Sequence, residues 1–206
     1  MKSYITLMVS VMVLASGCSH AQQPNADHSP SFREEQILIV YLSRTNNTKA
    51  IAQIIQRNVG GNLVSLELQQ AYPENYKAIV AQVHKENEEG FLPPLKTRID
   101  DIGQYKTIFI GTPTWDGQLP PPVRSFLHQY KLAGKTIIPF NTNAGYGIGS
   151  TFSTIRKLCP QSKVLEGYSS TGGIERDGVL FVMEGQKAKK TEADVKKWLQ
   201  KLGLLK

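Results

Sequence analysis

The chain has 206 residues, of which 40% are hydrophobic and 20% are charged, and its formal net charge is +7. This composition is typical of a globular domain, and the sequence has no internal repeat or low-complexity block, which excludes solenoid and fibrous architectures. The positive charge is not arranged as a basic stripe interleaved with aromatic residues, so the sequence predicts no nucleic-acid partner.

The N-terminus has the pattern of an export signal. Lys2 provides a positive charge, and residues 5–14 form an almost unbroken apolar run that leads into small residues. About ten apolar residues are too few to cross a bilayer, where roughly 20 are needed. Residues 1–17 are therefore predicted to be a cleaved signal peptide and not a membrane-spanning helix.

A cysteine directly follows this signal. Residues 15–18, with the sequence Ala-Ser-Gly-Cys, resemble the lipobox of bacterial lipoproteins, although Leu14 lies one place before the usual leucine. The resemblance implies that Cys18 carries a lipid and that the protein is exported and membrane-anchored, facing the periplasm or cell exterior. A plain cleaved signal with an incidental cysteine is the alternative. Residues 18–34 are predicted to be a flexible, lipid-attached linker, and residues 35–206 to be one domain.

Strands and helices alternate from residue 36 onward. Continuous apolar runs predict strands that are buried on both faces, and apolar residues three or four apart predict helices. Thr191 is the expected N-cap of the last helix, and the apolar run of residues 178–183 could add an edge strand. Cys159 is expected in the core and His84 on the surface. Strands are expected over residues 36–42, 62–68, 107–111, 136–141 and 163–168, and helices near residues 48–59, 74–87, 123–130, 152–158 and 191–202.

Five consecutive strand–helix units predict an α/β fold, in which a parallel sheet has helices on both faces. In an open parallel sheet, a ligand binds beyond the carboxyl ends of the strands, where the winding changes direction. Three loops lie there, over residues 43–48, 112–119 and 141–150. These loops are the candidates for a binding site.

The first loop leads directly into a helix and is rich in hydroxyl side chains. The start of a helix offers unpaired backbone N–H groups and a partial positive charge, which favour a phosphate. The loop has neither the lysine of a nucleoside-triphosphate loop nor the three glycines of a dinucleotide site, so a phosphomonoester fits it better. An ordinary polar turn in which Thr48 caps the helix is the alternative. The predicted phosphate ligands are Ser43, Arg44, Thr45, Asn46, Asn47 and Thr48.

Each of the other two loops contains one large aromatic residue. Trp115 follows a central strand and could stack on a flat heterocycle, and Tyr146 could supply the second stacking face. The glycines around Tyr146 let the backbone approach the edge of a ring closely. Alternatively, Trp115 covers the core and Tyr146 is an incidental loop residue.

Several of these segments resemble the flavodoxin family. Residues 37–49, with the sequence ILIVYLSRTNNTK, are similar to the first strand and phosphate loop of the family, and residues 72–76, 108–115 and 134–140 extend the similarity. Asn46 stands where glycine is commonest, and asparagine also tolerates left-handed backbone. The resemblance implies a flavodoxin-like three-layer sandwich with a five-stranded parallel sheet in the order 2-1-3-4-5, and non-covalently bound FMN.

The resemblance also assigns residues to parts of the cofactor. Residues 43–48 would bind the phosphate. In the family, a glycine-containing peptide at the position of Gly117 turns its carbonyl toward flavin N5 when one electron arrives. Neither a catalytic side chain nor a metal is expected. The flavin would be flanked by Pro113, Thr114, Trp115, Asp116 and Gly117, and its pyrimidine edge would be held by Thr142, Asn143, Ala144, Gly145, Tyr146 and Gly147.

These assignments predict an electron carrier, in which the protein supplies binding and electrostatics and the cofactor supplies the chemistry. The expected partners are unidentified redox proteins that donate and accept electrons, together with the membrane through the lipid anchor, and we expect a monomer. The alternative is an FMN-dependent NAD(P)H quinone or nitro reductase of the same fold. A third hypothesis is a domain that binds another phosphorylated ligand, with both aromatic residues incidental.

Overall fold

The computed structural model describes residues 36–205. The predicted signal peptide, Cys18 and the linker lie outside the described residues. No helix within the described range is both long and apolar enough to cross a membrane.

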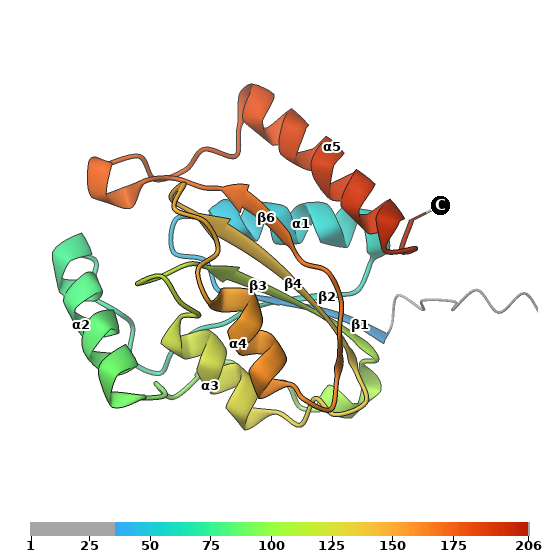
Figure 1. Cartoon of the computed structure of the whole chain (residues 1–206), viewed down its shortest axis with the longest axis horizontal. Helices are drawn as coiled ribbons and strands as arrows, with labels where there is room; N and C mark the ends of the chain where they lie inside the picture. The colour runs from blue at the N-terminus through green and yellow to red at the C-terminus, as the bar shows by residue number, and fades with distance from the viewer. Residues whose placement is uncertain (1–35, 206) are drawn as a thin grey trace, which may run out of the picture. The chain divides into compact units, whose positions relative to one another are not determined.

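A parallel sheet forms the middle layer (Figure 1). Its main path has the order β2-β1-β3-β4-β5, and β6 also pairs with β4. The predicted α/β class and the order 2-1-3-4-5 are therefore confirmed. The strands are β1 (Ile37–Tyr41), β2 (Asn62–Ser65), β3 (Thr107–Pro113), β4 (Thr136–Asn143), β5 (Lys163–Val164) and β6 (Tyr168–Thr171).

The fifth predicted strand, over residues 163–168, is divided in two because of a proline in its neighbour. Leu165 N donates to Ile137 O (2.9 Å), so the odd-numbered residues of β4 face this edge. Pro139 has no N–H to continue the ladder. Pairing with β4 therefore stops at the end of β5. It resumes in β6, whose first residue, Tyr168, lies opposite Phe140 of β4.

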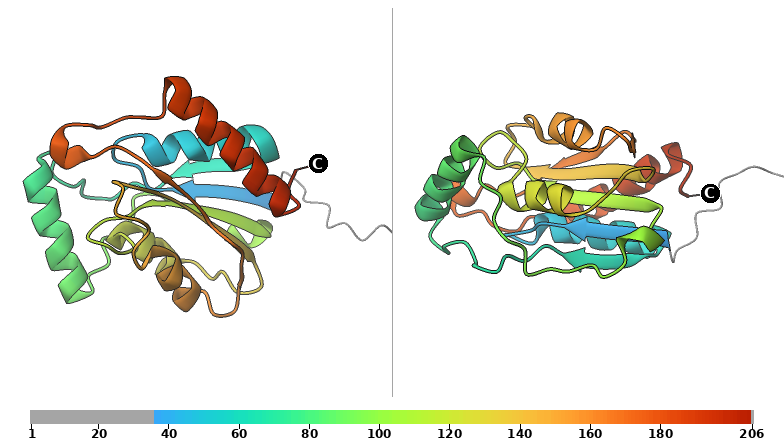
Figure 2. Two further views of the ribbon diagram at one scale, coloured as in Figure 1. Left: turned by 45° about the horizontal axis from the view of Figure 1, so that its top comes forward. Right: turned by 90° about the horizontal axis from the view of Figure 1, so that it is seen from below.

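Two helices cover each face of the sheet (Figure 1). On one face, α1 and α5 pack on residues such as Ile39 and Phe109; on the other, α3 and α4 pack on residues such as Leu38 and Ile110. The fifth helix, α2, lies near the carboxyl ends of the strands and contacts α3 of the second pair (Figure 2). The helices are α1 (Asn47–Val59), α2 (Tyr76–Glu89), α3 (Pro121–Gln129), α4 (Thr151–Leu158) and α5 (Gly185–Lys201), with short 3-10 turns η2 (Ile102–Gln104) and η3 (Glu175–Asp177).

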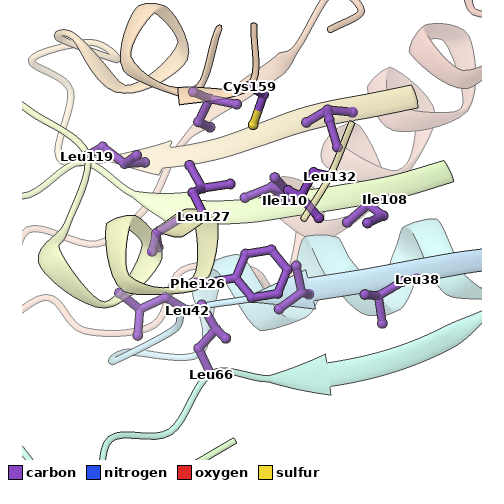
Figure 3. Close-up of a cluster of buried hydrophobic side chains, with 14 of the residues drawn as sticks. Leu38, Leu42, Leu66, Ile108, Ile110, Leu119, Phe126, Leu127, Leu132 and Cys159 are labelled. Carbon is purple, nitrogen blue, oxygen red and sulfur yellow. The ribbon is translucent and has the colours of Figure 1, made fainter. Parts of the chain in front are cut away.

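Figure 3 shows the core on the α3 and α4 side of the sheet. Phe126 of α3 is completely buried against this face, as are Ile108 and Ile110 of β3. Cys159 is buried in the same cluster, as predicted, and burial raises the pKa of its thiol to about 11. An apolar sheet between two helix layers is what the continuous apolar strands require.

Two local predictions near the C-terminus are wrong. The last helix begins at Gly185, and Thr191 is a buried residue within it whose hydroxyl donates to Met183 Sδ (3.7 Å). The first two turns of α5 contain lysine, glutamine and alanine but no large apolar residue, so hydrophobic spacing could not reveal them. Residues 178–183, all of which the structure describes, form no strand, and Val179 makes only an isolated bridge to Ile174.

Candidate functional site

The turn between β1 and α1 has the geometry of an anion-binding helix start. Asn46 adopts the left-handed conformation (φ 62°) and is the N-cap, with no side-chain cap bond. Thr48 is therefore not the cap, contrary to the alternative of an ordinary capped turn. Within residues 36–205, the backbone N–H groups of residues 45–48 donate to no protein group. Unpaired N–H groups at the positive end of a helix are the donors that a phosphate requires.

The first and third loops meet through two buried hydroxyl groups. Thr48 Oγ1 lies 2.8 Å from Thr142 Oγ1, and both residues are at least 96% buried. Ser43 is used differently, since its Oγ accepts a hydrogen bond from Lys49 N (3.2 Å) and closes the turn. The hydroxyl pair brings the end of β4 directly against the start of α1.

Asn47 has a role that the sequence did not indicate. Its Nδ2 donates to Leu180 O (2.6 Å), and its Oδ1 accepts from Val182 N (3.0 Å). Both ends of the amide therefore hold residues 172–183, which we call the covering segment. The side chain predicted to bind phosphate instead fastens this segment beside the phosphate loop.

The side chain of Arg44 reaches away from its own loop. Its Nε donates to Glu175 of the covering segment (2.7 Å), its Nη1 donates to Pro73 O (3.1 Å), and its Nη2 donates to Glu74 O. The ion pair between Arg44 and Glu175 is about four-fifths buried. Arg44 therefore links the first loop to the covering segment and to the entrance of α2.

A cavity opens where the three loops meet, and most of the predicted site residues line it. The covering segment and α2 contribute four lining residues that the sequence did not predict, Gly172, Gly173, Glu175 and Tyr76. The predicted residues that line it are Arg44, Thr45, Asn47, Thr48, Pro113, Thr114, Trp115, Thr142, Asn143 and Ala144. The predicted residues that do not line the cavity are Ser43, Asn46, Asp116, Gly117, Gly145, Tyr146 and Gly147.

Trp115 begins a tight turn at the end of β3. Its N–H and carbonyl both bond to Gln118 (3.2 and 2.9 Å), and Asp116 and Gly117 between them have φ values of 50° and 68°. Two successive positive φ values are the mark of a type I′ turn. The Gly117 carbonyl accepts from Ser150 N (3.0 Å), which ties the second loop to the third.

The ring of Trp115 is supported from behind. It packs edge-to-face on Tyr72, with 5.6 Å between ring centroids. The hydroxyl of Tyr72 donates to the buried carboxylate of Glu86 (2.5 Å). Burial and this hydrogen bond raise the pKa of Tyr72, so the hydroxyl stays a donor at neutral pH. The indole is thus held in one orientation at the cavity wall.

Asp116 fastens the same turn to α2. Its Oδ2 lies 3.2 Å from His84 Nδ1 and 3.1 Å from Asn87 Nδ2. The hydrogen bond to Asp116, with Glu88 nearby, raises the pKa of His84. Partial burial acts to raise the pKa of Asp116, but hydrogen bonds from Asn87, His84 and Gln118 together lower it. His84 is exposed, as predicted, and it also positions the turn that carries Trp115.

The third loop is organised by one asparagine. Asn143 Oδ1 accepts from Gly145 N (2.9 Å) and from Gly147 N (3.1 Å). Both glycines have positive φ values, 94° and 86°, which this tight loop requires. Tyr146 between them is 79% exposed and does not line the cavity, so the structure does not place its ring as a second stacking face.

A family model described as flavodoxin matches residues 36–202. No curated protein sequence matches the chain. Among solved structures, a proposed flavoprotein of Bacteroides eggerthii is 26% identical, with a TM-score of 0.63 over 80% of this chain and 96% of that chain. A proposed flavoprotein of Bacteroides uniformis is 21% identical, with a TM-score of 0.65 over 81% of this chain and 98% of that chain.

A third solved structure is a flavoprotein of Lactobacillus acidophilus in complex with FMN. It is 22% identical and has a TM-score of 0.55 over 66% of this chain and 92% of that chain. At this identity, the likeness concerns the fold. The family model covers most of the chain, and the sheet order agrees with it. The chain belongs to the flavodoxin family.

Proposed function

We propose that the chain is an FMN-binding electron-transfer protein. The observation that carries the proposal is the set of unpaired N–H groups at the start of α1, in a cavity that also presents the indole of Trp115. A phosphate suits the N–H groups, and a flat heterocycle suits the indole. FMN joins these two chemistries in one molecule, and the FMN complex of the Lactobacillus acidophilus flavoprotein supports the choice.

The donors at this edge match a phosphomonoester. Residues 45–48 supply backbone N–H groups, and Thr45 and Thr48 add hydroxyl groups. Glu175 brings a negative charge to the cavity, but its ion pair with Arg44 compensates for that charge. When bound, FMN would supply electron transfer, and the protein would bind it, orient it and shield part of it from water.

The structure offers little for turnover chemistry at the flavin. The polar side chains around Trp115 are engaged in fixing the turn, as with Asp116, which bonds to His84 and Asn87. An electron carrier needs no acid, base or nucleophile, so these observations favour a carrier over an NAD(P)H reductase.

The carrier and the reductase differ in their response to NADPH. We expect the FMN-loaded protein to stay yellow with NADPH alone under anaerobic conditions, and to be bleached by a chemical one-electron reductant. The measurement is flavin absorbance over time, with free FMN as the control. Rapid bleaching by NADPH, with turnover when a quinone is added, would contradict the carrier function and establish the reductase.

We also propose that the protein is exported and anchored through a lipid on Cys18. The support is the sequence pattern of residues 1–18, with residues 18–34 as the tether. An exported chain that crosses the membrane unfolded must acquire FMN outside the cytoplasm. Mass spectrometry of the mature N-terminus tests the anchor, and an unmodified Cys18 would contradict it.

A further inference from the structure

Three consecutive apolar side chains lie exposed on the covering segment. Val179, Leu180 and Phe181 are 46%, 51% and 42% exposed. Single apolar residues are common on a protein surface, whereas a contiguous apolar group marks a contact with another molecule or with a membrane. None of the three lines the cofactor cavity or the space between Trp115 and α2 that continues it. The group, which we call the apolar triad, is therefore free to contact something other than the cofactor.

The backbone that carries the triad is held in place. Asn47, the first residue of α1, donates to Leu180 O (2.6 Å) and accepts from Val182 N (3.0 Å). Val179 N donates to Ile174 O (3.1 Å) within the segment itself. The segment is thus fastened to the start of α1, and docking of the triad carries no cost of ordering this backbone first.

The helices next to the triad carry a strong excess of positive charge. Helices α1 and α5 lie together on one face of the sheet, and the covering segment leads into α5 (Figure 1). The two helices contain eight lysines and arginines but only two acidic residues. Four of the eight are exposed and form no ion pair with another residue of the range 36–205, namely Lys49, Arg57, Lys189 and Lys197. This face is complementary to a negatively charged surface.

Three of these lysines stand where a helix disfavours them. Lys187, Lys189 and Lys190 lie in the first two turns of α5, and its first turn has no acidic residue. The start of a helix carries a partial positive charge, so cations there destabilise the helix. Lys190 pairs with Asp194, whereas neither of the other two has a carboxylate partner among the described residues. A local arrangement that opposes stability is expected where it serves binding.

An anionic bilayer offers an apolar phase behind negative headgroups, which matches both features. Each lysine or arginine near such a bilayer strengthens binding about fivefold, and apolar side chains gain by entering the headgroup boundary. An acidic protein would also attract the lysines, but it would need an apolar pocket shaped for the triad. We propose that the apolar triad inserts into the surface of an anionic bilayer, with the basic residues of α1 and α5 along its headgroups. This docking is separate from the lipid proposed on Cys18 and does not depend on FMN.

The test measures binding to lipid vesicles by co-sedimentation, with a chain that begins at Ser19. This chain lacks the predicted signal and the lipid-bearing cysteine, and it keeps every helix, strand and core residue of the range 36–205. We expect it to bind vesicles of phosphatidylcholine with phosphatidylglycerol at least about tenfold more tightly than vesicles of phosphatidylcholine alone.

The apolar contribution is tested with Leu180→Ser combined with Phe181→Ser. This variant should bind the anionic vesicles about tenfold more weakly or worse, because two side chains no longer enter the apolar phase. Phe91→Ser is the matched control. Phe91 is 48% exposed, and its carbonyl accepts from Arg124 of α3, on the opposite face of the sheet from α1 and α5, so its loss should leave binding unchanged.

The charge contribution is tested with Lys49→Gln combined with Lys189→Gln, which should also weaken binding by about tenfold or more. Arg156→Gln combined with Lys157→Gln is the matched control. It removes the same charge from exposed positions of α4, which covers the opposite face of the sheet, so its effect should be much smaller.

Urea denaturation of each variant shows that the fold is intact. The proposal is overturned if the unaltered chain does not bind anionic vesicles, or if the serine variant of the triad binds them as tightly as Phe91→Ser does. Loss of binding in the lysine variant alone would overturn insertion and assign the surface to an acidic protein partner. A protein that binds no FMN refutes the proposed function, whereas the vesicle measurements still decide whether the triad docks on a membrane.

Discussion

Replacing Asn47 by aspartate should weaken FMN binding by about 100-fold. A carboxylate at the start of α1 competes with phosphate for the same N–H groups and the same positive helix end. Two unit charges about 5 Å apart repel by about 3 kcal/mol at an effective dielectric constant of about 20, which is slightly more than a hundredfold in affinity. The side chain is 97% buried and lines the cavity, so solvent screens little of this repulsion.

Two controls separate charge from the loss of the covering segment. Asn47→Ala removes the bonds to Leu180 and Val182 without adding charge, so it should affect FMN less than Asn47→Asp does. Riboflavin has no phosphate, and its affinity should therefore fall equally in both variants. Fluorescence titration gives all the affinities. Equal losses of FMN affinity in the two variants would show that phosphate does not bind at this loop.

Replacing Gly111 by alanine should lower the free energy of unfolding by about 3 kcal/mol, at the upper end of the usual cost of overpacking. Gly111 lies in β3 between Tyr41 of β1 and Phe140 of β4. A Cβ at this position would overlap the Phe140 ring and come within 2.9 Å of Tyr41 Cβ. Both neighbours are buried, so neither can move aside into solvent.

Urea denaturation of the wild type and variants measures this effect. Gly178→Ala is the control, because Gly178 has a positive φ of 76° but open space around it, and it should cost only about 1 kcal/mol. Phe140→Leu, which removes the ring, should recover part of the stability when combined with Gly111→Ala. Equal effects at the two glycines would show that the crowding around Gly111 is relieved at no cost.

The sheet could be predicted because each buried strand is a continuous apolar run. The division of the fifth strand depends on Pro139, whose place within the strand at residues 136–141 was visible in the sequence. Pro139 can donate no hydrogen bond to a neighbouring strand. The sequence could not show which neighbour of β4 would lack that hydrogen bond, because this depends on which edge of the strand the backbone N–H of residue 139 would face. The start of α5 could not be seen either, since its first turns lie outside the core.

The three loops of the site were predictable because they end parallel strands at one edge of the sheet. The covering segment could not be predicted, because Asn47 binds the backbone carbonyl of Leu180 and the backbone N–H of Val182. Every residue has a backbone carbonyl, and all but proline have an N–H, so the sequence does not indicate which of them form such bonds. The position of α2 beside the turn that carries Trp115 depends on hydrogen bonds over long sequence distances, such as that between His84 and Asp116. His84 was predicted only to be exposed, since one histidine on a helix has no distinguishing pattern.

Comparison of FMN and riboflavin binding to the unaltered protein tests most directly whether the N–H groups of residues 45–48 bind a phosphate beside Trp115. Charge-assisted hydrogen bonds contribute about 1.5–3 kcal/mol each, so we expect FMN to bind one-to-one and at least about 100-fold more tightly than riboflavin. Equal affinities for the two flavins, or no binding of FMN at micromolar concentration, would contradict the assignment of this site.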